Sequence, residues 1–304
     1  PELKLLEKSL NKKSKEFNNI LKIGRTHLQD ATPITLGQEF SGYEQMVTNC
    51  ISRIENNLPL LSRLAQGGTA VGTGINTHRD FGKLMAKEIS NLTKIKFNET
   101  PNHFEAQATQ DTIVSLSGSL KTLAVSLYKI ANDIRWLGSG PRSGLGELII
   151  PAVQPGSSIM PGKTNPVICE SLIQVSAQVI GYDSAITLGG LGGVFELNLM
   201  LPLISHNILE SINILSNGIK MFRLNLIKDL KANKQKCMDY IEHSLAMCTS
   251  LAPIIGYDKA AKISKKAYET GKTIRQIALE EKVLPKNELD KILDPYNMIK
   301  SNAK

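Results

Sequence analysis

The chain has 304 residues, of which 41% are hydrophobic and 21% are charged. This apolar fraction supplies enough surface for a sizeable core, which excludes a disordered chain. No apolar run approaches the roughly 18 residues that a membrane-spanning helix needs. Aromatic residues make up only 5% of the chain, so the core must consist of aliphatic side chains and Met. These features predict a soluble, mainly helical globular protein.

The formal net charge of +8 leaves nucleic acid, a membrane surface or small acidic molecules as partners. The basic residues are scattered along the chain, with no Arg-rich block, zinc-finger spacing or basic-aromatic motif of the kind that nucleic-acid readers use. A solvated, lysine-rich surface is the simplest explanation. We therefore expect neither a nucleic-acid nor a membrane partner.

The four cysteines, Cys50, Cys169, Cys237 and Cys248, are widely spaced and form no CxxC pair. This pattern indicates neither a disulfide framework nor a zinc site. The histidines at 78, 103, 206 and 243 also lack a metal-like partner at helical spacing. Reduced thiols and a cytoplasmic location fit best, and no metal site is expected.

In chain order, the first polar cluster is GRTHLQD at residues 24–30. It lies between a first helix and a helix predicted to begin at Pro33 with Thr32 as its cap. The imidazole of His27 could exchange a proton near neutral pH. A lone loop histidine is more often a surface or capping residue, so both interpretations stand at this point.

Apolar residues recur at steps of three and four in four segments, residues 40–58, 113–137, 168–186 and 201–222. Rods of about 20 to 30 residues would be roughly 30 to 45 Å long. Nothing alternates with period two for long enough to form a sheet. Because such narrow apolar seams pack nearly parallel or antiparallel, the pattern predicts an all-α fold built on a long antiparallel helix bundle.

The segment GGTAVGTGIN at residues 67–76 superficially suggests a phosphate-binding loop. A dinucleotide fingerprint needs a preceding strand, and a Walker loop needs Gly-Lys-Ser/Thr; neither is present. We interpret these glycines as positions where the backbone turns or passes close to another group, such as a substrate.

The densest cluster of unusual residues is QPGSSIMPGKTN at residues 154–165. Gly, Ser and Pro are typical of an ordinary linker. Asn165 before Pro166 also predicts a capped helix start, where backbone N–H groups beside Lys163 would form an anion site. Composition leaves both interpretations open.

From about residue 233 the helical segments become short, each with its own cap or breaker. They are predicted at Lys234–Leu251, Asp258–Thr270, Thr273–Glu281 and Pro285–Leu293. The predicted domains are therefore a long-helix bundle carrying the catalytic loops over residues 1–232 and a small helical domain over residues 233–304.

Taken together, these segments resemble the fumarase/aspartase superfamily. GSSIMPGKTNP at 156–166 is similar to the superfamily signature, and GRTHLQDATPITLGQEF at 24–40 is similar to class II fumarase. Aspartase has glutamine at the position of His27, while argininosuccinate and adenylosuccinate lyases differ in the flanking residues. GTAVGTGIN, NHFEAQATQD at 102–111, ANDIRWLGSGPR at 131–142 and IGYDKAAKISKKA at 255–267 also resemble class II fumarase.

The resemblance implies a hydro-lyase of the tricarboxylic acid cycle that hydrates fumarate to (S)-malate without metal or organic cofactor. Water adds anti through a carbanion-like intermediate. Ser157 would be the base at C3, His27 would handle the proton of the water or hydroxyl, and Glu170 would pair with His27. Contacts to the dicarboxylate substrate would come from Thr26, Ser158, Lys163, Thr164 and Asn165. The implied assembly is a homotetramer whose active sites are built from several subunits.

The family's additional N-terminal domain, with its Ser-, Thr- and Asn-rich substrate motifs, has no counterpart here, and the sequence starts at Pro1 within a helix-like stretch. We therefore expect the chain to comprise the central and C-terminal domains and to have little or no activity alone. Two alternatives are a related lyase, of the aspartate ammonia-lyase or argininosuccinate type, and a non-catalytic helical oligomerisation fragment.

Overall fold

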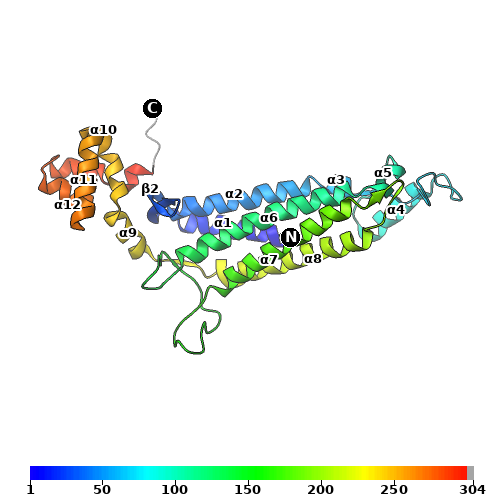
Figure 1. The fold of residues 1–304 in the computed structure, drawn as a ribbon, viewed down its shortest axis with the longest axis horizontal. Coiled ribbons are helices and arrows are strands. Elements are labelled where there is room, and N and C mark those ends of the chain that lie inside the picture. Colours follow the sequence, from blue (N-terminus) through cyan, green and yellow to red (C-terminus); the bar gives the residue numbers. More distant parts are fainter. Residues whose placement is uncertain (300–304) are drawn as a thin grey trace. The chain divides into compact units, whose positions relative to one another are not determined.

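The computed structural model describes residues 1–299 (Figure 1). The helices of more than one or two turns are α1 (Glu2–Glu16), α2 (Leu36–Glu55), α4 (Phe81–Thr93), α6 (Asp111–Leu137), α7 (Val167–Gly190), α8 (Leu201–Phe222), α9 (Lys234–His243) and α11 (Tyr257–Thr270). The shorter ones are α3 (Leu58–Leu61), α5 (His103–Ala108), α10 (Ala252–Ile255), α12 (Ile274–Glu280), α13 (Lys286–Ile292) and α14 (Pro295–Met298). A π-helical turn (Arg223–Ile227) follows α8, and a 3₁₀ segment (Leu245–Ser250) follows α9.

Strands are short and pair only two at a time in the described residues. The antiparallel pairs are β1 (Leu21–Thr26) with β2 (Gln29–Thr35), β5 (Leu148–Ile149) with β8 (Lys231–Ala232), and β6 (Gly193–Val194) with β7 (Leu197–Asn198). The parallel pair is β3 (Arg63–Leu64) with β4 (Asn98–Glu99). The prediction of an all-α fold is confirmed.

The described chain divides into two compact units, each assembled from separated segments. Unit 1 comprises Pro1–Glu7, Gln45–Asp133 and Val167–Leu224, and unit 2 comprises Lys8–Glu44, Ile134–Pro166 and the residues from Asn225 onward. The predicted domain boundary is a single cut at residues 232/233, whereas these units each combine several segments, so that boundary stays a prediction. No helix in residues 1–299 is both long and apolar enough to cross a membrane.

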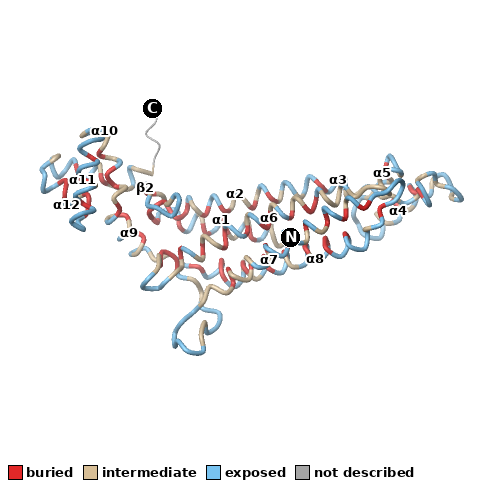
Figure 2. The backbone as a smooth tube through the Cα atoms, viewed as in Figure 1, coloured by how far each residue is buried: buried red, intermediate tan, exposed pale blue. Residues whose placement is uncertain are grey.

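Unit 1 contains the helical seams that the periodicity predicted. In its part of α6 the predicted apolar positions from Leu116 to Ile130 are all buried, as are Leu172, Val179 and Ile186 of α7. Of the pattern predicted over residues 201–222, Leu201 and Ile212 of α8 are exposed. Figure 2 shows these buried positions as stripes along helices that lie side by side. Helices α7 and α8 pack against each other, and the β6–β7 hairpin reverses the chain between them, so they run antiparallel.

A buried carboxylate joins two helices of unit 1. The carboxylate of Asp183 on α7 accepts a 2.7 Å hydrogen bond from the Ser117 hydroxyl and a 2.6 Å bond from the Lys121 ammonium, both on α6. Only 6% of the Asp183 side chain is exposed. Each oxygen has a donor, so the cost of burying this charge is offset by direct pairing.

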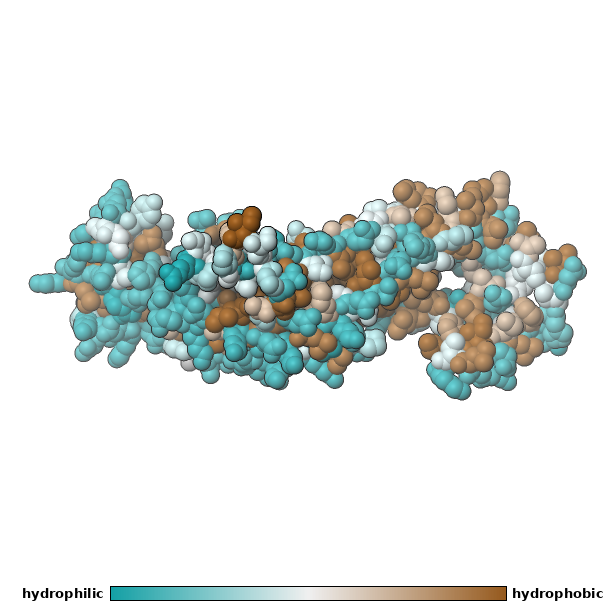
Figure 3. All heavy atoms as spheres, turned by 90° about the horizontal axis from the view of Figure 1, so that it is seen from below, coloured by the Kyte–Doolittle hydropathy of each residue, from teal (hydrophilic) through white to brown (hydrophobic). Residues whose placement is uncertain are grey.

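Unit 1 also exposes many large apolar side chains. Those around the β6–β7 hairpin include Leu191, Val194, Phe195, Leu197 and Leu199, of which Phe195 is 87% exposed. Figure 3 shows apolar side chains gathered at its right-hand end, over unit 1. Apolar patches of this kind mark contact surfaces in soluble proteins.

The first segment of unit 2 contains α1 from Lys8 onward, followed by the β1–β2 hairpin. The prediction that a helix starts at Pro33 with Thr32 as cap is wrong, because both residues lie in β2. Helix α2 starts at Leu36 instead. The Thr35 hydroxyl accepts from the Gln38 amide at 3.0 Å, and the Gln38 side chain accepts from the Thr35 amide at 2.9 Å. This reciprocal pair is a capping box.

From Lys234 on, unit 2 matches the predicted short helices, except that the helix predicted at Lys234–Leu251 is divided into α9 and the 3₁₀ segment Leu245–Ser250. Thr273 caps α12 through a capping box with Gln276, and Gly271 ends α11 in the left-handed conformation with φ of 68°. Leu21 and Ile23 of β1 belong to the same buried apolar cluster as these helices. One face of the hairpin is therefore anchored in the C-terminal core.

Gly37 and Gly42 of α2 provide a matched test of the packing in unit 2. A Cβ at Gly37 would lie 2.5 Å from both the Asn18 Cα and the Ser14 carbonyl oxygen, whereas nothing lies within 4 Å of one at Gly42. Gly37→Ala should therefore lower the free energy of unfolding by about 1–3 kcal/mol through overpacking. Gly42→Ala should raise it by about 0.5–1 kcal/mol through helix propensity. Urea unfolding of both variants measures the difference, and equal effects would contradict the close approach.

Candidate active site

The tip of the β1–β2 hairpin presents His27. Thr26 pairs with Gln29 across the hairpin, which leaves His27 and Leu28 as a two-residue turn. Both have positive φ, 54° and 62°, which is the backbone of a type I′ turn. This turn usually contains Asn and Gly, and a leucine with positive φ is strained. Thr26, His27 and Leu28 are exposed, so the turn displays their side chains to solvent.

The predicted serine loop lies between β5 and α7 and is closed by its own hydrogen bonds. The Gly156 amide donates to the Lys163 carbonyl at 2.7 Å, and the Asn165 side-chain amide donates to the Gly156 carbonyl at 3.0 Å. Helix α7 starts at Val167, one residue later than the cap at Asn165 predicted. The segment is thus a closed loop rather than an extended linker, and the Asn165 side chain supplies one of the hydrogen bonds that close it.

Within this loop, the hydroxyl oxygen of Ser157 is an acceptor for two backbone donors. The amides of Ile159 and Met160 donate to it at 3.1 and 3.0 Å. Hydrogen bonds that donate to an oxygen stabilise its negatively charged form relative to its neutral form. The two amides therefore lower the cost of forming an alkoxide at Ser157, as a serine that acts as a base requires.

Three of the predicted loop residues line a cavity in unit 2. The cavity is about 470 Å³ and is lined by Lys163, Thr164 and Asn165, with Leu148 and Asn233 among the other lining residues. Lys163 and Thr164 are exposed; Ser158, next to Ser157, is also exposed but is not among the residues that line this cavity. An exposed ammonium and a hydroxyl at a cavity are suited to an anionic ligand such as a carboxylate.

Beneath the hairpin lies a buried charge cluster. Glu147 is fully buried, and its carboxylate accepts from both terminal nitrogens of Arg25, at 2.8 and 3.1 Å. The Lys22 ammonium, also buried, lies 3.7 Å from Glu147 and 3.4 Å from Glu39, and donates to the Ile23 carbonyl at 3.0 Å. The two carboxylates balance the two cations, so the cluster has no formal net charge.

The β1–β2 pairing is irregular where Lys22 and Arg25 reach the same carboxylate. Residues three apart on a regular strand point to opposite faces. Ile23 pairs with Pro33 but Arg25 pairs with Asp30, so a β-bulge places one extra residue in β2, opposite Gly24. Beside this bulge, Leu21 and Ile23 belong to the apolar cluster, while Lys22 and Arg25 both pair with Glu147.

The cluster affects the protonation of its members and neighbours. Burial acts to lower the pKa of Arg25, but the hydrogen bonds and charge of Glu147 outweigh it and raise that pKa. Burial, with the nearby Glu147 charge, raises the pKa of Cys237 to about 12. The Cys237 thiol donates to the Glu147 carbonyl at 3.7 Å. This cysteine is therefore a neutral structural thiol at physiological pH.

The structure brings some of the predicted site residues together and not others. Ser157, Ser158, Lys163, Thr164 and Asn165 share the closed loop. Thr26 and His27 share the hairpin tip, and within residues 1–299 no hydrogen bond joins that tip to the loop. Glu170 lies in the first turn of α7, half-buried, and belongs to unit 1. Its pairing with His27 stays a prediction.

The sequence interpretation missed Arg25, Glu147, Lys22 and Glu39 as contributors to the site. A signal was present in two of them. Glu147 stands within the otherwise uncharged run LGELII, and Lys22 within ILKIG. A lone charge flanked by apolar residues has to find a partner if its segment is buried. The identity of that partner depends on tertiary contacts between residues 122 apart.

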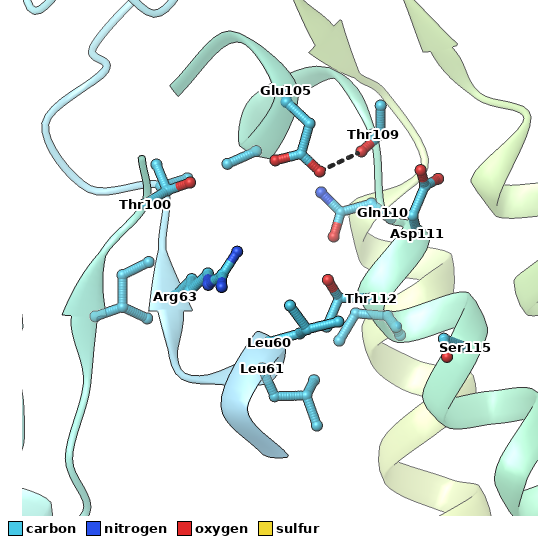
Figure 4. Close-up of a pocket in the computed structure, with 14 residues that line it drawn as sticks. Leu60, Leu61, Arg63, Thr100, Glu105, Thr109, Gln110, Asp111, Thr112 and Ser115 are labelled. Atoms are coloured by element: carbon cyan, nitrogen blue, oxygen red, sulfur yellow. Dashed lines mark hydrogen bonds between the residues drawn. The ribbon is translucent and has the colours of Figure 1, made fainter. Parts of the chain in front are cut away.

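A second cavity, of about 500 Å³, lies in unit 1 and contains none of the predicted site residues. Arg63 of β3, Glu105 of α5 and Gln110 before α6 line it, and Figure 4 shows their side chains directed into the opening. The Thr109 hydroxyl donates to Glu105 at 3.3 Å. Among the described residues, no group of His, Cys, Asp and Glu is arranged to hold a metal ion.

Gly156→Ala tests whether the loop closure holds Ser157 in place. A Cβ at Gly156 would lie 2.7 Å from the Asn165 amide nitrogen and 2.8 Å from the Lys163 carbonyl oxygen. Both contacts are with backbone, so the loop has to open to accept the methyl group. We expect limited proteolysis within residues 154–165 to accelerate at least about threefold. Thr164→Ala, in the same loop, should cleave at the parental rate; equal rates for all three proteins would refute the closure.

Two family models match the chain. One, described as a lyase family, covers residues 1–181, and the other, described as the fumarase C C-terminus, covers residues 247–300. The mitochondrial fumarate hydratase of Saccharomyces cerevisiae is 52% identical over 98% of this chain and 61% of its own length. The class II fumarate hydratase of Corynebacterium glutamicum is 51% identical over 98% of this chain and 64% of its own length. The chain thus spans less than two thirds of these relatives.

Solved structures agree with the sequence relatives. The class II fumarase from Schistosoma mansoni superposes with a TM-score of 0.94 at 38% identity, covering 98% of this chain and 65% of that one. A β-carboxy-cis,cis-muconate cycloisomerase from Acinetobacter calcoaceticus, at 20% identity, shares the fold with a TM-score of 0.81. The lyase-family match over residues 1–181, the fumarase C match and identities near one half show that the chain belongs to the fumarase/aspartase superfamily of lyases, in its class II fumarase branch.

Proposed function

We propose that the chain forms the central and C-terminal parts of a fumarate hydratase, which interconverts fumarate and (S)-malate by anti addition of water. The observation that carries this proposal is the identity of 52% over 98% of the chain to a fumarate hydratase. A related ammonia-lyase activity is less favoured, because the curated relatives at about half identity are named as hydratases. The non-catalytic alternative rests only on the chain spanning less than two thirds of the length of these relatives.

In the direction of malate dehydration, Ser157 removes a proton from C3 as an alkoxide. The amides of Ile159 and Met160 support this role, because they donate to the hydroxyl oxygen that would carry the charge. Removal of the proton leaves a carbanion whose charge spreads into the neighbouring carboxylate. Lys163, exposed at the adjoining cavity, is the cation suited to stabilise that charge.

The second half of the reaction needs an acid for the departing hydroxyl group. His27 is the proposed donor, since imidazole exchanges protons near neutral pH and the turn exposes it. A carboxylate beside the ring would orient it and favour its protonated form, and Glu170 is the proposed partner. In the hydration direction the same groups act in reverse, with His27 accepting a proton from water.

Substrate carboxylates would be held by Thr26, Ser158, Lys163, Thr164 and Asn165. Except for Thr26, these residues lie in the closed serine loop, which presents an ammonium, hydroxyls and an amide. The loop therefore carries both the proposed base and most of the proposed binding groups. We propose no metal or organic cofactor, because proton removal next to a carboxylate is served by these polar groups alone.

We further propose that the enzyme is a homotetramer with active sites shared between subunits. The exposed apolar side chains of unit 1, including Leu191, Phe195 and Leu199, support association because water disfavours so much apolar surface. A cytoplasmic location is proposed because the four buried cysteines form no disulfide. Relatives named as mitochondrial and as bacterial class II enzymes both occur.

Fumarate absorbance during malate dehydration tests the function, using the enzyme expressed from its natural open reading frame. His27→Asn and Ser157→Ala should each lower kcat by at least about 100-fold, because each removes a proton-transfer group. His78→Asn, an exposed loop histidine, and Ser184→Ala, an exposed helix serine, serve as matched controls and should retain parental kcat. Near-parental rates in His27→Asn and Ser157→Ala would reject the assignment, as would release of ammonia from aspartate as the main activity.

A further inference from the structure

The hairpin tip that carries His27 cannot fix its own position. His27 and Leu28 are exposed and have strained positive φ angles, and no hydrogen bond from their side chains occurs within residues 1–299. The direction of the tip must therefore come from the base of the hairpin. On one face, that base is held by apolar packing of Leu21 and Ile23, which is non-directional.

The other face of the base is held by a directional contact. Arg25 lies two residues before His27, and its guanidinium binds the Glu147 carboxylate through two parallel hydrogen bonds of 2.8 and 3.1 Å. A bidentate pair of this kind fixes both the distance and the orientation of its partners. Because Glu147 is fully buried, water cannot substitute for either hydrogen bond.

Glu147 is in turn joined to the structure that leads into the serine loop. It directly precedes β5, ten residues before Ser157, and its backbone carbonyl accepts from the Asn233 amide at 2.8 Å. Its neighbour Leu148 pairs with Ala232 in the β5–β8 ladder. One end of the ion pair is thus the residue that directly precedes β5, ahead of the loop, and the other lies in β1, the strand before the His27 turn.

We propose that Arg25 and Glu147 are positioning residues for the hydration reaction, which fix the His27 turn relative to the stem of the serine loop. The inference rests on the proposed function. Neither residue touches substrate in this account; their bidentate contact sets the geometry of the proton donor.

The alternative role for the pair is stability alone. Removing one partner of a buried ion pair destabilises a protein whatever else the pair does, so loss of stability cannot distinguish the two roles. A positioning role predicts a particular kinetic pattern. The rate of proton transfer falls while substrate binding persists, because most of the proposed carboxylate contacts lie in a loop closed by its own hydrogen bonds.

The primary variant is Arg25→Lys in the enzyme from its natural open reading frame. Lysine keeps the charge but cannot reproduce the two parallel hydrogen bonds. We expect kcat to fall roughly 10- to 100-fold, as for a misplacement of about 1 Å, with KM changed less than about threefold. Combined with His27→Asn, the same substitution should lower the residual kcat no further, because both changes act through one group.

Asp183→Asn is the matched control. Asp183 is another buried carboxylate paired with a cation, Lys121, but it lies in unit 1 between α6 and α7. This variant should lower the thermal midpoint while keeping the parental kcat. A parental kcat in folded Arg25→Lys, or an equal loss of kcat in Asp183→Asn, would overturn the positioning role.

A pair replacement covers the case in which a single variant does not fold. Arg25→Met with Glu147→Met removes both charges together, which costs less than leaving one buried charge unpaired. Circular dichroism verifies folding, and the folded double variant must show the same loss of kcat. If it turns over at the parental rate, the inference fails. If His27→Asn itself retains parental activity, the proposed function fails first, whatever the Arg25 variants do.

Discussion

A single buried carboxylate organises the hairpin region of unit 2. Glu147 has no contact with solvent and binds Arg25 and Lys22, two cations from one strand. Removing one partner of such a pair typically costs about 3–5 kcal/mol, which is a large share of the stability of a typical domain. The sequence requirements around the hairpin follow from this burial: the two cations, Lys22 and Arg25, and Glu39 to balance the second charge.

Much of the fold could be predicted from the sequence because the long helices bury regular stripes. The spacing of apolar residues in α6, α7 and α8 indicates most of the positions that face inward, as Leu120, Leu172 and Leu215 show, although Leu201 and Ile212 of the same predicted pattern are exposed. The caps of the short C-terminal helices were equally predictable, since Thr273 and Gly271 act on neighbours within four residues. The hairpin was not, because Thr32-Pro33 has the local pattern of a helix start and its strand pairing is decided by residues further away.

The candidate site also has one part that local sequence could predict and another that depends on distant residues. The serine loop closes through contacts between residues at most nine apart, so its composition already pointed to a distinct structure at Ser157. The turn at His27 contains neither glycine nor asparagine, the residues that usually predict such a turn. Its positive φ angles depend on the pairing of the two strands that it joins. The ion pair beneath it links residues 122 apart. From the sequence, Arg25 and Glu147 are two charged residues whose pairing could not be predicted.

The interleaving of the two units has a consequence for biosynthesis. Unit 1 is tied by a hydrogen bond from Arg223 to Glu2, across 221 residues, and unit 2 by one from Lys13 to the Leu230 carbonyl, across 217. Neither unit can complete its fold until most of the chain has left the ribosome. Until then, the apolar stripes of the early helices remain exposed to solvent. The nascent polypeptide should therefore depend on chaperones that shield helices α1, α2 and α6 until the later segments arrive.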